Sequence, residues 1–330
     1  MKKIICLSLL LSTVLIGSLY AYTKKETSTS SSVGQTTEMI TQSSEQSQQD
    51  TNKHRQTSSV LWRVEKSGKP VSYLLGTIHI GKIGSSLPKE MVQALSESKV
   101  LITEANMEPD FQELMQLSQL MLDPQGNLEQ KLGEHDFRAL ASMTKNVPAQ
   151  ALKQFKPWAA FTLAMYGTPN GYSEEFGIDK LLTKQAITTD KERVFLEKIE
   201  EQLQFFADVP EEKIISALKV MLQNATSTQA ETQKLIDFYE KNNLDQLAAL
   251  TLNKENTLKN FPPNDQKYWA HWFYETLLKE RNHHWLAVID QQLSQQSTLI
   301  AVGSAHLMGE NGLIQLLKNK GYTLTPISLN

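Results

Sequence analysis

Two histidines of this chain occur in the same four-residue pattern, Gly-x-x-His, far apart in the sequence. The first copy runs from Gly76 to His79 and the second from Gly303 to His306. Each copy follows an apolar run typical of a strand, and a glycine at a strand end lets the backbone turn sharply. Chance would give about 0.3 such spacings among 15 glycines and 7 histidines in 330 residues. Because ligands bind at the carboxyl ends of strands in open α/β sheets, the repetition predicts a functional role.

A carboxylate follows a third predicted strand, in which Val100 to Thr103 lead to Glu104. If the three strands are parallel neighbours, their carboxyl ends lie within one or two strand spacings of about 4.8 Å. Two imidazoles and a carboxylate suit a divalent ion such as Mn, Co, Fe or Zn, with water in the open positions. We therefore predict that His79, His306 and Glu104 share a metal site. Taken singly, a histidine after a strand is more often structural than a ligand, and Glu104 alone would more often be a surface carboxylate. Glu197 also follows a short apolar run and is a weaker candidate.

Arg281 is an unusual residue of a predicted helix near the carboxyl terminus, from about 265 to 292. Leu277 and Trp285 flank it at helical spacing, which places it on an apolar stripe. Its long side chain could extend to the rim of the core, or it could clamp a carboxylate or act as an electrophilic donor in the site. The sequence leaves both interpretations open. The remaining histidines suggest no site, since His283 and His284 adjoin charged residues on an expected solvent-facing surface.

The order of the predicted elements favours an α/β fold with mixed α+β character. Residues 61–103 read as a hairpin, a helix and a strand, and residues 298–327 read as strand, helix and strand. The long middle, roughly 111–260, has mostly helical periodicity. We expect a central mixed sheet built from the βαβ-like units of both chain ends, with a large helical insertion between them.

The first 59 residues predict export and tethering. A short basic start and the uncharged apolar run 4–23 indicate a signal peptide (1–23) or an N-terminal membrane anchor. Residues 24–59 are dominated by Ser, Thr and Gln, which is typical of a disordered tether. A single domain, 60–330, follows. We expect a periplasmic or secreted protein, or one anchored to the outer face of the cytoplasmic membrane. The net charge of −3 and the lack of a basic cluster argue against nucleic-acid binding.

Six short motifs together resemble the TraB/GumN family, which is related to the Tiki proteases that act on secreted signalling proteins. The resemblance covers residues 60–330. Its motifs are Tyr73–His79, Ile102–Glu104, Gly177–Asp179, Phe195–Glu197, Glu280–Asn282 and Val302–Leu307. It implies a Tiki-like fold and a metal-dependent hydrolase that uses Mn or Co, with Zn or Fe as alternatives. By the same resemblance His79 and His306 are metal-site residues, Glu104 is the essential carboxylate, and Arg281 is a partner in the site.

Two classes of function follow from these observations. In the first, the protein is an exported metal-dependent hydrolase, specifically a peptidase, in which a metal-activated water attacks an amide and Glu104 transfers protons. In the second, it is a non-catalytic exported protein whose crevice binds a peptide or a metal ion. The expected partner is a peptide or protein substrate in the first case, and in either case an uncleaved N-terminal segment would tether the protein to a membrane.

Overall fold

The computed structural model of this protein describes residues 58–144, 147–166 and 168–329. The predicted signal or anchor segment and residues 24–57 of the predicted tether lie outside the described residues. Ser58 and Ser59, at the end of that tether, are buried, so packed structure begins before residue 60. No helix within the described ranges is both long enough and apolar enough to span a bilayer.

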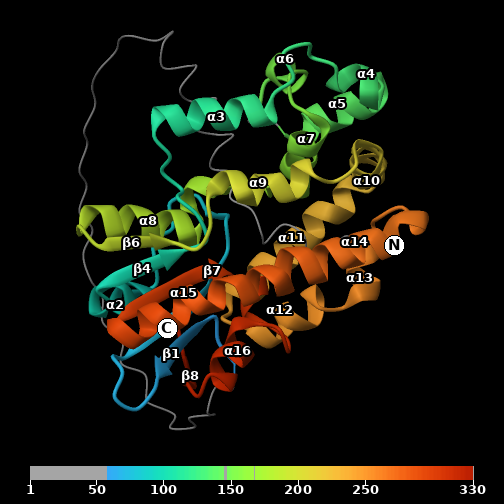
Figure 1. Ribbon diagram of the computed structural model, residues 1–330. Helices are drawn as coiled ribbons and strands as arrows, with labels where there is room; N and C mark the ends of the chain where they lie inside the picture. Colours follow the sequence, from blue (N-terminus) through green and yellow to red (C-terminus); the bar gives the residue numbers. More distant parts are fainter. Residues whose placement is uncertain (1–57, 145–146, 167, 330) are drawn as a thin grey trace, which may run out of the picture.

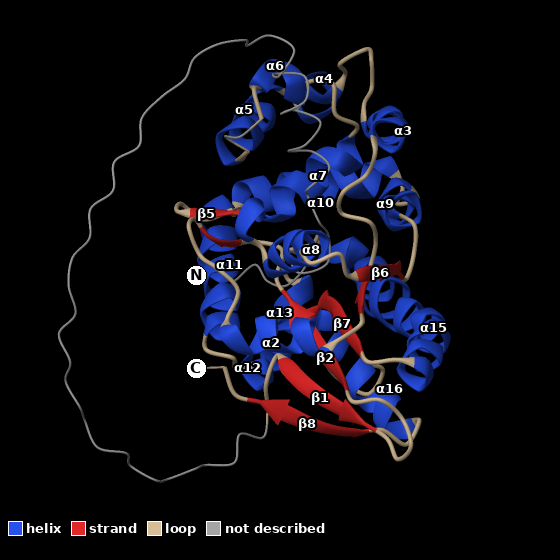
Figure 2. Cartoon of the chain, turned by 90° about the vertical axis from the view of Figure 1, so that its left-hand side faces the viewer, coloured by secondary structure: helices blue, strands red, loops and turns tan. Residues whose placement is uncertain are grey.

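A six-stranded mixed sheet lies at the centre of the fold, in the order β6-β4-β7-β2-β1-β8 (Figure 2). The four strands β6, β4, β7 and β2 are mutually parallel, β1 is antiparallel to β2, and β8 is antiparallel to β1. Its strands are β1 (Leu61–Glu65), β2 (Ser72–Thr77), β4 (Val100–Thr103), β6 (Glu192–Phe195), β7 (Thr298–Gly303) and β8 (Thr323–Ile327). The short strands β3 (Gly81–Lys82) and β5 (Tyr172–Ser173) pair separately. The expected α/β class and central mixed sheet are confirmed.

The C-terminal strand β7 lies between the two N-terminal strands β2 and β4, so both chain ends build the centre of the sheet. Thr77 of β2 aligns with Gly303 of β7, while Thr103 of β4 aligns with Ala301 of β7 and with Phe195 of β6. The carboxyl ends of these four strands therefore meet at one edge of the sheet.

Helices cover both faces of the sheet. The crossovers from β2 through α2 to β4 and from β7 through α16 to β8 run in opposite directions across the sheet. Since such crossovers are right-handed, the two helices belong on opposite faces. Accordingly α2 packs with α8 on one face, and α15 packs with α16 on the other. The helices around the sheet are α2 (Lys89–Glu97), α8 (Ile178–Thr188), α15 (Arg281–Gln295) and α16 (Leu313–Asn319).

The predicted helical insertion is present, and much of it gathers above the sheet in both views (Figures 1 and 2). Its helices are α3 (Phe111–Met121), α4 (Leu128–Leu132), α5 (Glu134–Met143), α6 (Ala149–Leu152), α7 (Pro157–Tyr166), α9 (Ile199–Ala207), α10 (Glu211–Gln223), α11 (Ala225–Glu240), α12 (Leu244–Thr251) and α13 (Lys254–Leu258). Its apolar residues join those of the sheet in a common core.

The helix predicted over about 265–292 is present, but its geometry changes along its length. It begins as α14 (Gln266–Ala270), continues as a π-helix (His271–Glu280), and ends as α15. π-Helical segments are rare, and those that do occur are often found at functional sites. This one ends directly before Arg281.

Candidate active site

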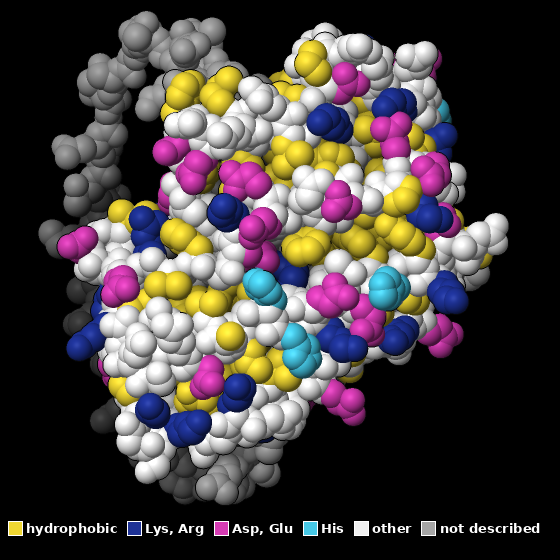
Figure 3. Space-filling model, in the orientation of Figure 1, with side chains coloured by type: hydrophobic (Ala, Val, Ile, Leu, Met, Phe, Trp, Pro, Cys, Tyr) yellow, Lys and Arg dark blue, Asp and Glu magenta, His cyan; other side chains and the backbone are white. Residues whose placement is uncertain are grey.

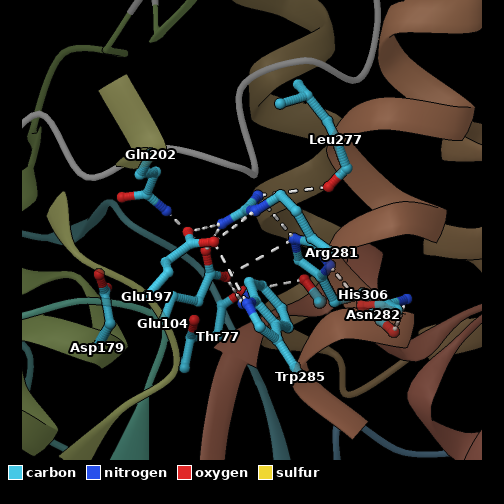
Figure 4. Close-up of polar contacts among 12 residues, drawn as sticks. Thr77, Glu104, Asp179, Glu197, Gln202, Leu277, Arg281, Asn282, Trp285 and His306 are labelled. Carbon is cyan, nitrogen blue, oxygen red and sulfur yellow. Dashed lines mark hydrogen bonds and ion pairs between the residues drawn. The ribbon is translucent and has the colours of Figure 1, made fainter. Parts of the chain in front are cut away.

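Arg281 lies at the centre of a buried ionic cluster (Figure 4). Its Nη2 atom donates to Oε2 of Glu104 at 2.8 Å and to Oε1 of Glu197 at 2.5 Å, and its Nε donates to Oε2 of Glu197 at 3.2 Å. The side chain is only 3% exposed. Burial lowers the pKa of Arg281, but the two carboxylates outweigh burial and raise it. Of the two interpretations left open by the sequence, the carboxylate clamp is the one that the structure shows.

Glu104 is held by donors from three parts of the chain. Besides Arg281, the backbone N–H of Gly303 donates to its Oε1 at 2.7 Å, and Nε2 of Gln202 donates to its Oε2 at 2.9 Å. An ionised carboxylate accepts hydrogen bonds at both oxygens and can satisfy all three donors. The residue directly follows β4, as predicted, and its carboxylate is fixed in position at the carboxyl edge of the sheet.

Glu197 makes more contacts in the site than its sequence context, that of a weaker candidate, indicated. Its side chain is 7% exposed, both of its oxygens accept from Arg281, and the indole N–H of Trp285 donates to Oε2 at 3.3 Å. Burial raises the pKa of Glu197, and the neighbouring guanidinium offsets part of that increase. Glu104 and Glu197 thus form a pair of carboxylates bridged by one cation.

His306 lies completely buried beside this cluster. Its Nδ1 atom is 2.7 Å from Oδ1 of Asn282, and its Nε2 is 3.3 Å from Nη1 of Arg281 and 3.9 Å from Oε1 of Glu104. The indole ring of Trp285 packs against the imidazole, with ring centroids 4.5 Å apart. Burial, together with the positive charges of Arg281 and His79, holds the pKa of His306 well below its ordinary value.

The imidazole of His79 is held by a carboxylate at its Nδ1 atom. Its Nδ1 lies 2.7 Å from Oδ2 of Asp179, which belongs to the first turn of α8, and both side chains are almost fully buried. Burial lowers the pKa of His79, but Asp179 and, to a smaller extent, Glu104 outweigh burial and raise it. His79 and His306 follow the neighbouring parallel strands β2 and β7, so the two motifs lie at the same edge of the sheet, as predicted.

A cavity of about 20 Å³ lies at the carboxyl edge of the sheet, between the ends of β2 and β4 and α8. Glu104, His79 and Asp179 contribute its charged lining. The other lining residues are Thr77, Thr103, Ala105, Met107, Gln202, Ala301 and Val302. Oδ1 of Asp179 is buried and makes no hydrogen bond to the described residues. A cavity of this volume has room for one water molecule or one small ion.

Glycines bring the strand ends together. A Cβ atom on Gly76 would lie 2.9 Å from Cβ of Ser304, so the first glycine of the repeated motif lets β2 approach the residue that follows β7. A Cβ atom on Gly177 would lie 2.4 Å from the carbonyl oxygen of His79, so this glycine lets the start of α8 reach the same strand end. The spacing of the motif thus serves close packing as well as placement of the histidine.

The structure brings together all four residues predicted for the site, His79, Glu104, Arg281 and His306. The sequence alone did not assign roles to four further residues that contact them. These are Asp179, Gln202, Asn282 and Trp285. Asp179 and Asn282 belong to motifs that resemble the TraB/GumN family, so the sequence held a signal for both. Gln202 belongs to none of these motifs. His283 and His284 are exposed, as expected. Histidine side chains are visible at the surface in Figure 3.

The binding of a metal ion by this site remains a prediction. Among the described residues, no group of three or more His, Cys, Asp or Glu side chains is arranged so that it could hold an ion. The oxygens of Glu104 accept from Arg281, Gln202 and Gly303 instead.

Comparison with known families fits the fold and the site. A model of the TraB/PrgY/gumN family matches residues 60–326, which is most of the chain. The chain belongs to this family. All of the side chains described above lie within the matched range, so the resemblance seen in the short motifs is confirmed at the level of the family.

Individual relatives of this TraB/PrgY/gumN protein are distant. The uncharacterized protein YbaP of Shigella flexneri is 23% identical over 76% of this chain and 89% of its own length, and YbaP of Escherichia coli K12 is 23% identical over 74% and 87%. The metalloprotease TIKI1 of Danio rerio is 23% identical over 80% of this chain, which covers 62% of that protein. No solved structure matches the chain.

Proposed function

We propose that this protein is an exported metal-dependent hydrolase that cleaves peptide bonds at the site formed by His79, Glu104, Arg281 and His306. The observation that carries the proposal is the convergence of two imidazoles and a carboxylate at the ends of three adjacent parallel strands. The relationship to a protein named as a metalloprotease supports the same chemistry. Export is part of the proposal because the N-terminal run reads as a signal or anchor segment.

The side chains at the site are of the kind that a divalent ion requires. Both imidazoles have Nδ1 held by an oxygen of a neighbouring side chain, which turns Nε2 of each ring away from that partner. Nε2 is a common ligand atom in metal sites. The ring nitrogen that does not bind the metal commonly donates to an oxygen, which fixes the orientation of the histidine. His79, His306 and Glu104 are therefore the residues that would hold the ion. This requires an exchange of hydrogen-bond partners, because both oxygens of Glu104 are already engaged and Nη1 of Arg281 lies 3.3 Å from Nε2 of His306.

The roles of the protein groups follow from their positions. A bound divalent ion would make water more acidic and polarise the carbonyl of the scissile bond. Glu104 borders the water-sized cavity and can accept a proton there and return it to the leaving amine. Arg281 donates to Glu104 and Glu197, so it holds the carboxylates in place and balances their charge. The small cavity cannot hold a peptide, so a bound substrate would have to extend beyond it.

A second candidate function is non-catalytic binding of a peptide or a metal ion in the same crevice. One observation favours its metal-free form, the binding of a peptide: the guanidinium of Arg281 already supplies a positive charge between Glu104 and Glu197. The two carboxylates thus have a counter-charge from the protein itself. The two functions differ in whether bound metal and peptide cleavage occur together.

The test combines metal analysis with a cleavage assay on purified protein. The wild-type protein should contain close to one equivalent of ion after loading with Mn or Co, and it should cleave members of a peptide library. A chelator should abolish cleavage, and added Mn or Co should restore it. His79→Ala and His306→Ala should each lower the metal content, because a lost ligand removes a large part of the binding free energy. His283→Ala is the matched control, since His283 is exposed.

Glu104→Gln separates the two roles of that carboxylate. If proton transfer is its main role, turnover should disappear while metal content falls less. Metal binding without cleavage of any peptide would favour the non-catalytic function. A protein that binds no divalent ion, or a metal content that the two histidine substitutions leave unchanged, would refute the proposed metal site.

A further inference from the structure

The side chain of Asn282 makes hydrogen bonds that settle its own orientation. Its Nδ2 atom donates to two backbone carbonyl oxygens, of His306 at 3.1 Å and of Asn311 at 2.8 Å. A side-chain amide nitrogen has two N–H groups, and both are used here. The opposite orientation would point the amide oxygen at two other oxygens. Oδ1 is therefore the atom that faces His306.

This orientation decides which nitrogen of His306 carries the proton. Oδ1 of Asn282 lies 2.7 Å from Nδ1 of the imidazole. An amide oxygen can only accept a hydrogen bond, so Nδ1 must be the donor. In the neutral ring Nε2 then carries the lone pair, and Nη1 of Arg281, 3.3 Å away, is a donor that matches it. Trp285 packs against the ring and limits its rotation.

We propose that Asn282 is a positioning residue, which holds His306 as the Nδ1–H tautomer and so presents the lone pair of Nε2 to the site. Asn282 is 1% exposed and adjoins Arg281 at the start of α15. One helix end thereby sets both the clamp on the carboxylates and the tautomer of the histidine. The metal-binding consequence rests on the proposed function, whereas the tautomer does not.

The tautomer is measured in the metal-free protein by NMR. Histidine is labelled with ¹⁵N, long-range ¹H–¹⁵N correlations report which ring nitrogen is protonated, and His306→Gln assigns the signal. We expect His306 of the wild-type protein to be protonated at Nδ1 and unprotonated at Nε2 at neutral pH. An Nε2–H tautomer in the wild-type protein would overturn the proposal without any variant.

Two substitutions test whether Asn282 is the cause. Asn282→Leu keeps the branched shape of the side chain but removes the acceptor, so His306 should lose its preference for the Nδ1–H form. Asn282→Asp keeps an acceptor at this position and should retain a protonated Nδ1. Asn242→Ala is the control for a lost buried asparagine, since Asn242 is 6% exposed and its Oδ1 accepts from the N–H of Val60 at 2.7 Å, away from the site. It should leave the signal of His306 unchanged.

Metal titration of the same proteins gives the second readout. Asn282→Leu should weaken the binding of Mn or Co by about 10- to 100-fold, as is typical when an outer partner of a metal-binding histidine is lost. Asn282→Asp should retain more of the affinity. If the wild-type protein binds no ion but shows the Nδ1–H tautomer, the proposed function fails and the role of Asn282 stands. An unchanged tautomer in Asn282→Leu would refute that role, whatever the metal content.

Discussion

Replacement of Arg281 by methionine should destabilise the folded protein strongly at neutral pH. Methionine keeps much of the length and the apolar stem but removes the only guanidinium that contacts Glu104 and Glu197 among the described residues. Two carboxylates less than one-tenth exposed would then remain without their counter-ion. Loss of one partner of a buried ion pair costs about 3 to 5 kcal/mol. For a domain of this size that cost lowers the melting temperature by roughly 6 to 20 °C.

The pH dependence of this loss has a definite sign. Burial already raises the pKa of Glu197 above 4.5, although Arg281 opposes the increase, so the pKa should rise further in the methionine variant. A carboxyl group whose pKa is higher in the folded state favours folding below its unfolded pKa, and that contribution is lost as the pH rises through the folded pKa. The difference between wild type and Arg281→Met should therefore shrink as the pH falls from neutral toward 4.5.

Urea unfolding followed by circular dichroism, with a chelator in every buffer, measures the effect. The matched control is Arg138→Met, because Arg138 pairs with Glu134 four residues away while 71% exposed. That pair should be worth only about 0.3 to 0.5 kcal/mol. The double variant Arg281→Met/Glu197→Gln removes one uncompensated charge and should be more stable than Arg281→Met by at least about 1 kcal/mol. A loss below about 1 kcal/mol in Arg281→Met, or no recovery in the double variant, would refute the argument that buried charge dominates.

Three further outcomes are expected. Gly76→Ala should cost about 1 to 3 kcal/mol in urea unfolding, because its Cβ would lie 2.9 Å from that of Ser304 and push β2 away from the residue after β7; a neutral effect would show that the strands can shift freely. Asp179→Asn should lower the pKa of His79, measured by NMR titration of the metal-free protein, because the carboxylate that raises it is removed; an unchanged pKa would contradict this assignment. Removal of residues 1–57 should leave the melting temperature within a few degrees of that of the full chain. In the shortened chain, Ser59→Ala should cost about 1 to 3 kcal/mol, because the Ser59 hydroxyl donates to the carbonyl of Ile327 at 2.6 Å. Equal melting temperatures for the shortened chain and its Ser59→Ala variant would contradict this role of Ser59.

The strand ends could be predicted from the sequence because each one is a local pattern. An apolar run followed by Gly-x-x-His or by a carboxylate lies within about ten residues, and the strand propensity of such a run is strong. Hence β2, β4 and β7 were located together with the residues that follow them. The sequence indicated less directly that these strands are neighbours. In the sheet β7 lies between β2 and β4, but in the chain it follows β4 by nearly 200 residues.

The partners of the site residues could not be predicted in the same way. Gln202 reaches Glu104 from α9, and Asp179 reaches His79 from α8, across sequence separations of 98 and 100 residues. Apart from the Gly177–Asp179 motif of the resemblance, nothing local distinguishes these polar side chains from solvent-facing ones on an amphipathic helix. The π-helix before Arg281 was equally hidden, because hydrophobic spacing predicts a helix without fixing its hydrogen-bond register.

The two Gly-x-x-His motifs look alike in the sequence, yet the structure makes their histidines chemically different. A carboxylate, that of Asp179, holds Nδ1 of His79, whereas an amide, that of Asn282, holds Nδ1 of His306. The carboxylate favours a positively charged ring, and the amide beside the guanidinium of Arg281 favours a neutral one. For the proposed metal site the two rings are therefore not equivalent, because His79 would have to be uncharged to bind an ion, whereas His306 is already held in its neutral form. Exchange of the two outer partners, Asp179→Asn with Asn282→Asp, should therefore not reproduce the wild-type site, although it restores the same set of side chains.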